Sequence, residues 1–99
     1  MLPTMHPLDA LGNPVRRDML RALRAGPLAV GQLAERFPVS RPAVSRHLRV
    51  LEDAGLVESH PDGAQRVYAV RIQGFAAVRD YLDEFWDTAL ARLQKLAER

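Results

Sequence analysis

Apolar residues recur at helical spacing over the first third of the chain. Asn13-Pro14 suits the start of a helix, because asparagine can cap a helix and proline fits its first turn. The apolar pattern then continues over Val15–Leu23, and Gly26-Pro27 ends it. A shorter helix is expected around His6–Leu11. Another is predicted over Val30–Phe37, whose apolar residues follow the i, i+3, i+4, i+7 rule.

The next segment completes a helix-turn-helix pair. Pro38 cannot continue the preceding helix smoothly, because it pushes the residue before it out of the helical region. Ser40 reads as the N-cap of a further helix, which buries a stripe formed by Val44, Leu48 and Leu51. Two helices joined by a three-residue turn, the second of them basic, are typical of a DNA-reading helix-turn-helix.

After Gly55 the period changes from helical to that of strands. Two strands are predicted, over Leu56–His60 and Arg66–Val70. The residues Pro61-Asp62-Gly63 between them strongly favour a turn. A hairpin directly after a recognition helix is a wing. The expected fold class is mainly α with a small β-hairpin, a winged helix-turn-helix of order α-α-α-α-β-β-α. We expect one domain over residues 1–99, with the helix-turn-helix at about 30–54 and the wing at about 56–72.

The last segment, about residues 74–98, is helical again and apolar along one whole face. A single small domain cannot cover a face of this length, so we expect a helix that dimerises with a second copy of the chain. The alternative is packing on the first helix of the same chain. The expected interface residues are Phe75, Val78, Leu82, Phe85, Trp86, Ala89, Leu93 and Leu96.

Charge favours a nucleic-acid surface on the helix-turn-helix. The net charge is only +2, yet residues 36–50 hold four arginines and no acid. A local basic stretch on a near-neutral chain fits DNA reading, and a solvated helix face is the plainer alternative. A winged helix that binds a protein instead would present an apolar or acidic face here.

Several classes of chemistry are excluded or not expected. The chain has no cysteine, so it has no disulfide and no thiol redox switch. Its three histidines lie far apart and at no metal-ligand spacing, and no phosphate loop or nucleophile motif is present. We expect no metal, no cofactor and no catalysis. Met1–Ala10 lacks a signal-peptide pattern, and no apolar run approaches the ~20 residues of a membrane span, so a cytoplasmic protein is expected.

The recognition helix turns a polar face outward when its core stripe faces in. Arg46 is the expected base reader, bidentate to guanine, while Arg41 and Arg49 are expected on phosphates. Arg66 on the wing is expected at phosphate or the minor groove, or as a plain surface residue. The full set of expected DNA contacts is Ser40, Arg41, Pro42, Ser45, Arg46, Arg49 and Arg66. Arg16 and Arg17 suit phosphate contact, but a solvated face or an intraprotein ion pair fits them at least as well.

Five segments, in order, resemble the ArsR/SmtB family of repressors. Ala10–Leu20 is similar to the family opening "AL.(D/N)P.RR..L", and Val30–Phe37 is similar to the first helix of its helix-turn-helix. Ser40–Val57 keeps every fixed position of the family pattern "S.P.VS.HL..L..AGLV". Arg66–Tyr68 resembles the return strand of the wing, and Phe85–Leu93 resembles a cysteine-poor branch of the family. The resemblance implies a homodimer that binds pseudo-palindromic operator DNA and is released by an effector.

Two positions depart from the family. Metal-sensing members carry ligands before the recognition helix or on the last helix; Leu28–Gly31 offers none, and the last helix has acids but no histidine. Metal sensing is therefore not carried over. Ala29 stands where the family usually has a capping Thr or Ser, so we expect that helix start to be weaker by roughly 1 kcal/mol if no other group caps it. Tyr81, Phe85 and Trp86 suit either an effector pocket or, more commonly, a dimer core.

Overall fold

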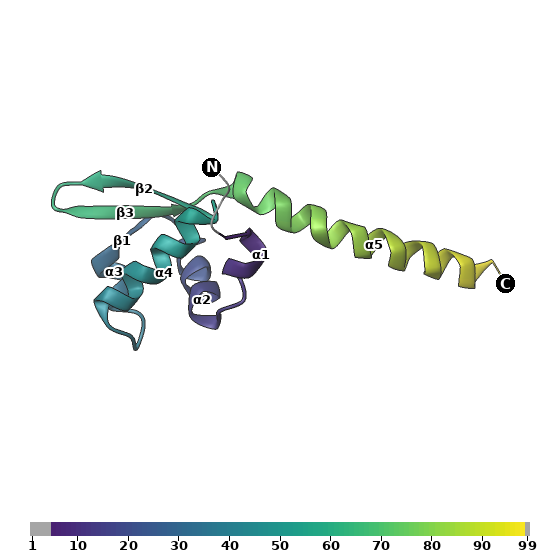
Figure 1. Ribbon diagram of the computed structural model, residues 1–99, viewed down its shortest axis with the longest axis horizontal. Helices are drawn as coiled ribbons and strands as arrows, with labels where there is room; N and C mark the ends of the chain where they lie inside the picture. The colour runs from purple at the N-terminus through teal and green to yellow at the C-terminus, as the bar shows by residue number, and fades with distance from the viewer. Residues whose placement is uncertain (1–4, 99) are drawn as a thin grey trace.

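The computed structural model describes residues 5–98 as a small body from which one long helix projects (Figure 1). The fold is mainly helical with a small antiparallel sheet, which confirms the expected winged helix-turn-helix class. The absence of a signal peptide was inferred partly from residues 1–4, which lie outside the described residues. The elements in chain order are α1 (Pro7–Ala10), α2 (Pro14–Leu23), β1 (Leu28–Ala29), α3 (Val30–Ala34), α4 (Arg41–Asp53), β2 (Val57–Asp62), β3 (Gln65–Val70), the 3-10 helix η1 (Ile72–Phe75) and α5 (Ala76–Ala97).

Side-chain caps fix the starts of two helices where the sequence predicted them. Asn13 Oδ1 accepts hydrogen bonds from the N–H groups of Val15 (2.8 Å) and Arg16 (3.2 Å) at the start of α2. Ser40 Oγ accepts from the N–H of Ala43 at 3.2 Å at the start of α4. Each oxygen satisfies a backbone donor that the first turn of a helix leaves without a partner.

The start of α3 has a partial substitute for the missing cap. Ala29 is its N-cap and has no side-chain acceptor to offer, as expected from the sequence. Gln32 Oε1, however, accepts a hydrogen bond from the N–H of Ala29 at 2.8 Å. This is the reciprocal half of a capping box, so Gln32 stabilises a helix start that would otherwise be weaker.

The helix-turn-helix consists of α3 and α4, and its connection is longer than predicted. The sequence placed the first helix as far as Phe37 with a three-residue turn, but α3 ends at Ala34 and residues 35–40 form the connection. Pro38 disfavours helical backbone at Phe37, so the chain leaves the helix early. Phe37 nevertheless packs against the core from this connection.

The sheet has three antiparallel strands in the order β1-β3-β2, one more than the predicted hairpin. The extra strand contains only Leu28 and Ala29, which pair with Tyr68 and Val67 of β3. Two residues are too few to show the alternation that reveals a strand in a sequence. This pairing makes β3 the central strand and leaves β2 at the edge.

The wing, which is the hairpin of β2 and β3, turns more tightly than predicted. The sequence placed the turn at Pro61-Asp62-Gly63, but β2 continues to Asp62, which pairs with Gln65. An edge strand tolerates proline, so Pro61 does not end β2. The turn itself is Gly63-Ala64.

The core lies between the helices of the body and the sheet. The predicted stripe of α4 is fully buried, which turns the opposite face of this helix outward. The largest side chains with almost no exposure are Met19, Leu33, Val44, Leu48, Leu51, Leu56 and Val57.

Helix α5 extends away from the body (Figure 1). Every side chain from Arg79 to Glu98 is exposed. The start of α5 contacts α1, but the alternative considered from the sequence, packing of the apolar face on the first helix of the same chain, does not hold for residues 79–98.

Candidate nucleic-acid interface

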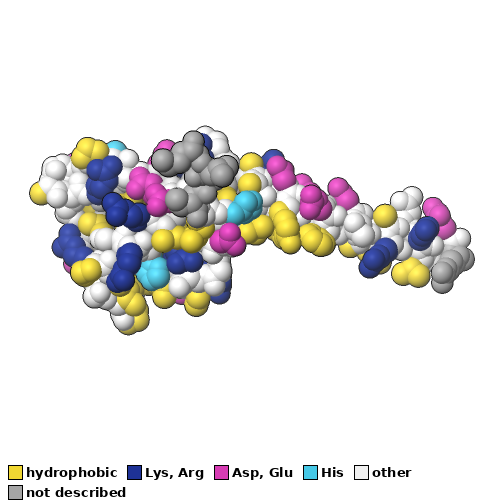
Figure 2. Space-filling model, in the orientation of Figure 1, with side chains coloured by type: hydrophobic (Ala, Val, Ile, Leu, Met, Phe, Trp, Pro, Cys, Tyr) yellow, Lys and Arg dark blue, Asp and Glu magenta, His cyan; other side chains and the backbone are white. Residues whose placement is uncertain are grey.

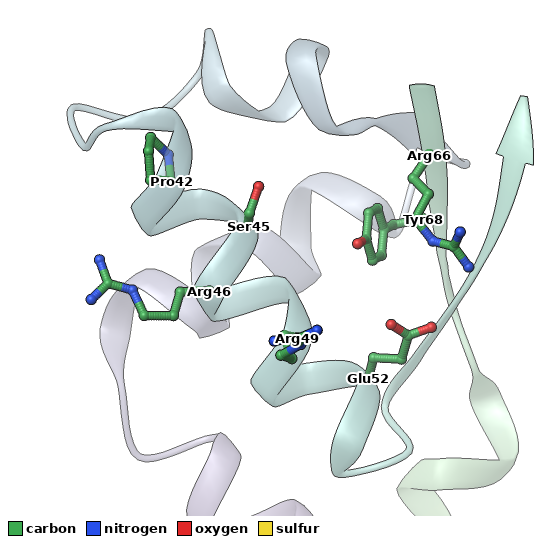
Figure 3. A pocket seen from close by; sticks show the side chains of 7 residues that line it. All are labelled: Pro42, Ser45, Arg46, Arg49, Glu52, Arg66 and Tyr68. Atoms are coloured by element: carbon green, nitrogen blue, oxygen red, sulfur yellow. The ribbon is translucent and has the colours of Figure 1, made fainter. Parts of the chain in front are cut away.

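A groove of about 730 Å³ lies between α4 and the wing (Figure 3). Its lining includes three arginines, one carboxylate and one phenol. Three cations against one anion give the groove a positive potential that suits a polyanion. The lining residues are Pro42, Ser45, Arg46, Arg49 and Glu52 of α4 and Arg66 and Tyr68 of β3. We call this surface the α4–wing groove.

The structure brings together most of the side chains that the sequence singled out for DNA contact. Pro42, Ser45, Arg46, Arg49 and Arg66 all line the α4–wing groove and are all exposed. Figure 3 shows Arg46 extending from α4 on the side away from the wing, whereas Tyr68 faces α4 from β3. The exposed cations therefore spread across α4 and onto the wing.

The remaining two expected residues lie outside the groove, at the N-terminal end of α4. Ser40 uses its hydroxyl oxygen to cap the helix through Ala43. Arg41 is exposed, and its guanidinium lies beside α3: a methyl group at Gly31 would stand 3.8 Å from Arg41 Nη2. Both residues sit where free backbone N–H groups give a helix a positive end.

Sequence reasoning missed two residues of the groove, Glu52 and Tyr68. The Ser59 hydroxyl donates to Glu52 Oε2 at 2.6 Å, and Ser59 Oγ accepts from Arg66 Nε at 3.1 Å. Ser59 pairs with Tyr68 across the hairpin, so both side chains share one face of the wing. The available signal was helical spacing, since Glu52 lies three residues after Arg49 on the same side of α4.

Tyr68 forms an almost fully buried wall of the groove, with 8% of its surface exposed. Burial raises the pKa of its phenol, and the negative charge of Glu52 raises it further, against the opposing charges of Arg66 and Arg49. Tyr68 therefore stays neutral at physiological pH and adds no negative charge to the groove.

His47 lies half-buried on α4, on the flank of the core stripe as expected. Burial lowers the pKa of its imidazole, and the nearby positive charges of Arg16 and Arg46 lower it further. His47 is therefore neutral at pH 7, and the positive charge of this helix comes from its arginines.

Arg16 and Arg17 have a role that was not considered from the sequence. Arg16 Nε donates to the carbonyl oxygen of Ala10 at 2.7 Å, and Arg17 Nη1 donates to that of Leu11 at 2.7 Å. These carbonyls end the short helix α1, where cations satisfy the last acceptors and favour the helix dipole. The two arginines therefore join α2 to α1.

A second surface is the apolar face of α5. Its large side chains are between 46% (Tyr81) and 65% (Trp86) exposed. Figure 2 shows hydrophobic side chains along one edge of the projecting helix and acidic ones along the other. Phe75 and Val78, at the start of this face, are half-buried, and Phe75 packs against the core. The exposed members are Tyr81, Leu82, Phe85, Trp86, Leu90, Leu93 and Leu96.

Within residues 5–98, no cluster of three or more His, Asp or Glu side chains could hold a metal ion. Across the same range, no helix has the length and apolar character needed to cross a membrane.

Comparison with known proteins identifies the family. A family model described as a helix-turn-helix domain matches residues 11–60. The chain is 49% identical over 90 residues to the HTH-type transcriptional regulator Rv2034 of Mycobacterium tuberculosis, which covers 91% of this chain and 84% of that protein. It is 34% identical over 61 residues to the transcriptional repressor SdpR of Bacillus subtilis, which covers 62% of this chain and 68% of that protein.

A solved structure agrees with these relatives. The crystal structure of an ArsR family transcriptional regulator superposes with a TM-score of 0.76 and 34% identity, over 82% of this chain and 89% of that one. The helix-turn-helix of α3 and α4 and the wing are the features expected of these relatives. The chain therefore belongs to the ArsR/SmtB family of helix-turn-helix transcriptional regulators.

Proposed function

We propose that this DNA-binding regulator is a homodimeric repressor that binds a pseudo-palindromic operator through the α4–wing groove. The observation that carries the proposal is the groove itself, where exposed arginines of the recognition helix and of the wing surround one concave surface. In this proposal the protein performs no catalysis and acts in the cytoplasm, where it meets the operator.

The proposed contacts divide into base reading and phosphate binding. Arg46 projects from the middle of α4, away from the wing, and we assign it to a guanine in the major groove. Ser45 is placed at a base edge or a phosphate. Arg49 and Arg41 are assigned to phosphates, which orient the protein without reading sequence. Arg66 places the wing on the DNA backbone or in the minor groove.

The apolar face of α5 supports the homodimer. A projecting helix with seven large apolar side chains in water is an aggregation hazard unless a partner covers them. A second copy of α5 offers the same apolar face, so two helices pair by a two-fold axis and bury both faces at once. The same axis would place two α4 helices on two half-sites, which is the reason for a pseudo-palindromic operator.

A hollow on this face, lined in part by Val78, Leu82 and Trp86, is assigned to the dimer core. A small-molecule effector, which the family resemblance implies, stays a prediction.

The rival function, a winged helix that binds proteins without specific DNA binding, required an apolar or acidic outward face on α4. The observed face presents Arg46 and Arg49 instead. The regulators and repressors among the relatives favour DNA in the same way.

Selection from a pool of random duplexes tests the proposal without knowledge of the operator. The purified protein is expected to enrich an inverted repeat whose half-sites are about one helical turn apart. Arg46→Ala is the matched variant and is expected to lose the enrichment of one position in each half-site. A wild-type pool that stays random after repeated rounds, with the dimer intact, would contradict the proposal.

A further inference from the structure

We infer that Glu52 and Ser59 are positioning residues that hold Arg66 of the wing in place for the DNA backbone. The inference rests on the proposed function and adds two residues that do not touch DNA themselves. Two hydrogen bonds that share the Ser59 hydroxyl carry this inference. Arg66 Nε donates to Ser59 Oγ at 3.1 Å, and the Ser59 hydroxyl donates to Glu52 Oε2 at 2.6 Å.

These hydrogen bonds add a polar link between α4 and the wing, two elements that also pack together in the core. Glu52 lies in the last turn of α4, whereas Ser59 and Arg66 belong to the two strands of the wing. Ser59 pairs with Tyr68, and Arg66 lies two residues before Tyr68, so both side chains share the face of the wing nearest α4. A hydrogen bond from Ser59 to Glu52 therefore fixes the wing relative to the recognition helix.

The hydrogen bond from Arg66 to Ser59 also determines which donors of the Arg66 guanidinium remain available for DNA. Its Nε–H is used by Ser59, which leaves the two terminal amino groups of the guanidinium for a partner. A guanidinium held by one edge presents the remaining donors in a fixed plane, the geometry in which arginine binds phosphate with two parallel bonds. Arg66 is exposed, so a backbone phosphate can approach it.

The negative charge of Glu52 gives a second way in which this residue could affect DNA binding. Glu52 is half-buried in a groove that we assign to a polyanion, and an isolated carboxylate there repels phosphate. If Glu52 only repels, its removal strengthens binding to every duplex. If Glu52 positions Arg66 for a phosphate, its removal weakens binding to operator and scrambled duplex alike, because a free arginine must then be ordered when DNA binds. Ordering one long side chain corresponds to about two- to tenfold in affinity.

The experiment measures the affinity of the whole 99-residue chain for the selected operator duplex and for a scrambled duplex by fluorescence anisotropy. Glu52→Ala and Ser59→Ala are each expected to weaken operator binding by about two- to tenfold, and the double variant is expected to be no weaker than either one. Glu52→Gln is expected to bind at least as tightly as wild type, because the amide oxygen accepts the same bond from Ser59 and the repulsive charge is removed. In an Arg66→Ala background, Glu52→Ala is expected to cause no further loss of affinity.

Asp53→Ala is the matched control for charge. Asp53 is the next residue of α4, is exposed and does not line the groove. Its replacement therefore removes one negative charge and leaves the hydrogen bonds among Arg66, Ser59 and Glu52 in place. It is expected to bind the operator as tightly as wild type or slightly more tightly. Thermal melting of every variant shows that the fold is intact.

Two outcomes would overturn the inference. One is tighter binding of Glu52→Ala to both duplexes; the other is an unchanged operator affinity of Glu52→Ala or of Ser59→Ala. In both cases the wild type still binds its operator and the proposed function stands. Equal affinity of the wild type for operator and scrambled duplex would instead remove the proposed function, and the inference with it.

Discussion

A side chain at Gly74 would overlap the carbonyl oxygen of Gly55. Gly55 follows the last turn of α4 with a φ of 80°, and Gly74 lies in η1, so this contact joins the recognition helix to the start of α5. The backbone N–H of Arg71 adds a hydrogen bond to the carbonyl of Leu56 at 2.9 Å. The proposed reading helix and the proposed dimerisation helix are thus connected through backbone that leaves no room for a Cβ atom.

Gly74→Ala is expected to lower the free energy of unfolding by about 1–3 kcal/mol, because its neighbour is backbone and cannot rotate away. Urea denaturation followed by circular dichroism measures the change. Gly31→Ala is the matched control: its nearest neighbour, Gln65 Oε1 at 3.2 Å, ends a flexible side chain. Alanine also suits a helix better than glycine, so this variant is expected to be at least as stable as wild type. A Gly74→Ala variant of wild-type stability would refute the close contact.

Arg46→Ala is expected to reduce operator affinity and relax specificity at one base position of each half-site, by about 1–3 kcal/mol of discrimination. The physical reason is the loss of a bidentate contact to one base. Competition with operators changed at single positions measures the effect. Equal losses of affinity on operator and random DNA would show that Arg46 does not read a base.

Arg49→Ala is expected to weaken binding to all duplexes by a similar factor. A lost phosphate contact releases about one counterion fewer, so the slope of log affinity against log salt concentration becomes shallower by about 1. Titrations at several salt concentrations measure the slope. A change of sequence preference with an unchanged slope would reverse the roles assigned to Arg46 and Arg49.

Ala89→Glu is expected to disrupt the proposed dimer, whereas Ala91→Glu is not. Both alanines are exposed on α5, but Ala89 belongs to the apolar face and Ala91 lies almost opposite to it at about 100° per residue. Burying an unpaired carboxylate in the dimer is expected to raise its dissociation constant by about 100-fold or more. Light scattering coupled to size-exclusion chromatography measures the mass. The dimer proposal fails if both variants have the same mass profile as wild type.

His47→Gln is expected to flatten the pH dependence of stability on the acid side. Burial, together with the charges of Arg16 and Arg46, lowers the pKa of folded His47 below its ordinary value of 6.5. Above that value the imidazole is neutral in both states. Below it the unfolded chain takes up the proton first, so the free energy of unfolding of the wild type falls as the pH drops. Urea unfolding at several pH values between about 7.5 and 5 compares the two proteins. If the free energy of unfolding of the variant falls with pH as steeply as that of the wild type, His47 does not contribute to the acid-side loss of stability.

Local signals in the sequence were sufficient for much of the fold. Asn13 and Ser40 could be assigned as caps because capping depends on residues two or three positions away. The core stripe of α4 followed from helical periodicity, and the wing followed from two β-rich runs around a turn. Four of the expected DNA-contact residues line the groove from α4, because spacing on a helix determines which side chains share a face, and Arg66 joins them from β3.

The features that the sequence missed depend on how elements pack. The pairing of Leu28 with Tyr68 joins residues far apart in the chain and has no local signature. The bonds from Arg16 and Arg17 to carbonyls of α1 require the angle between two helices. The chain of hydrogen bonds from Arg66 to Glu52 requires the wing to lie against the end of α4. Spacing placed Glu52 beside Arg49, but only the packing shows what it touches.

Sequence-specific binding through the α4–wing groove is tested most directly by titrating the wild-type protein into a labelled operator duplex obtained by the selection described above. Anisotropy is followed at two salt concentrations, with an unlabelled scrambled duplex of equal length as competitor. We expect binding that the competitor does not displace and that weakens steeply with salt, because arginines of the α4–wing groove replace counterions on phosphates. Equal displacement by operator and scrambled duplex would contradict the claim that this groove reads a DNA sequence.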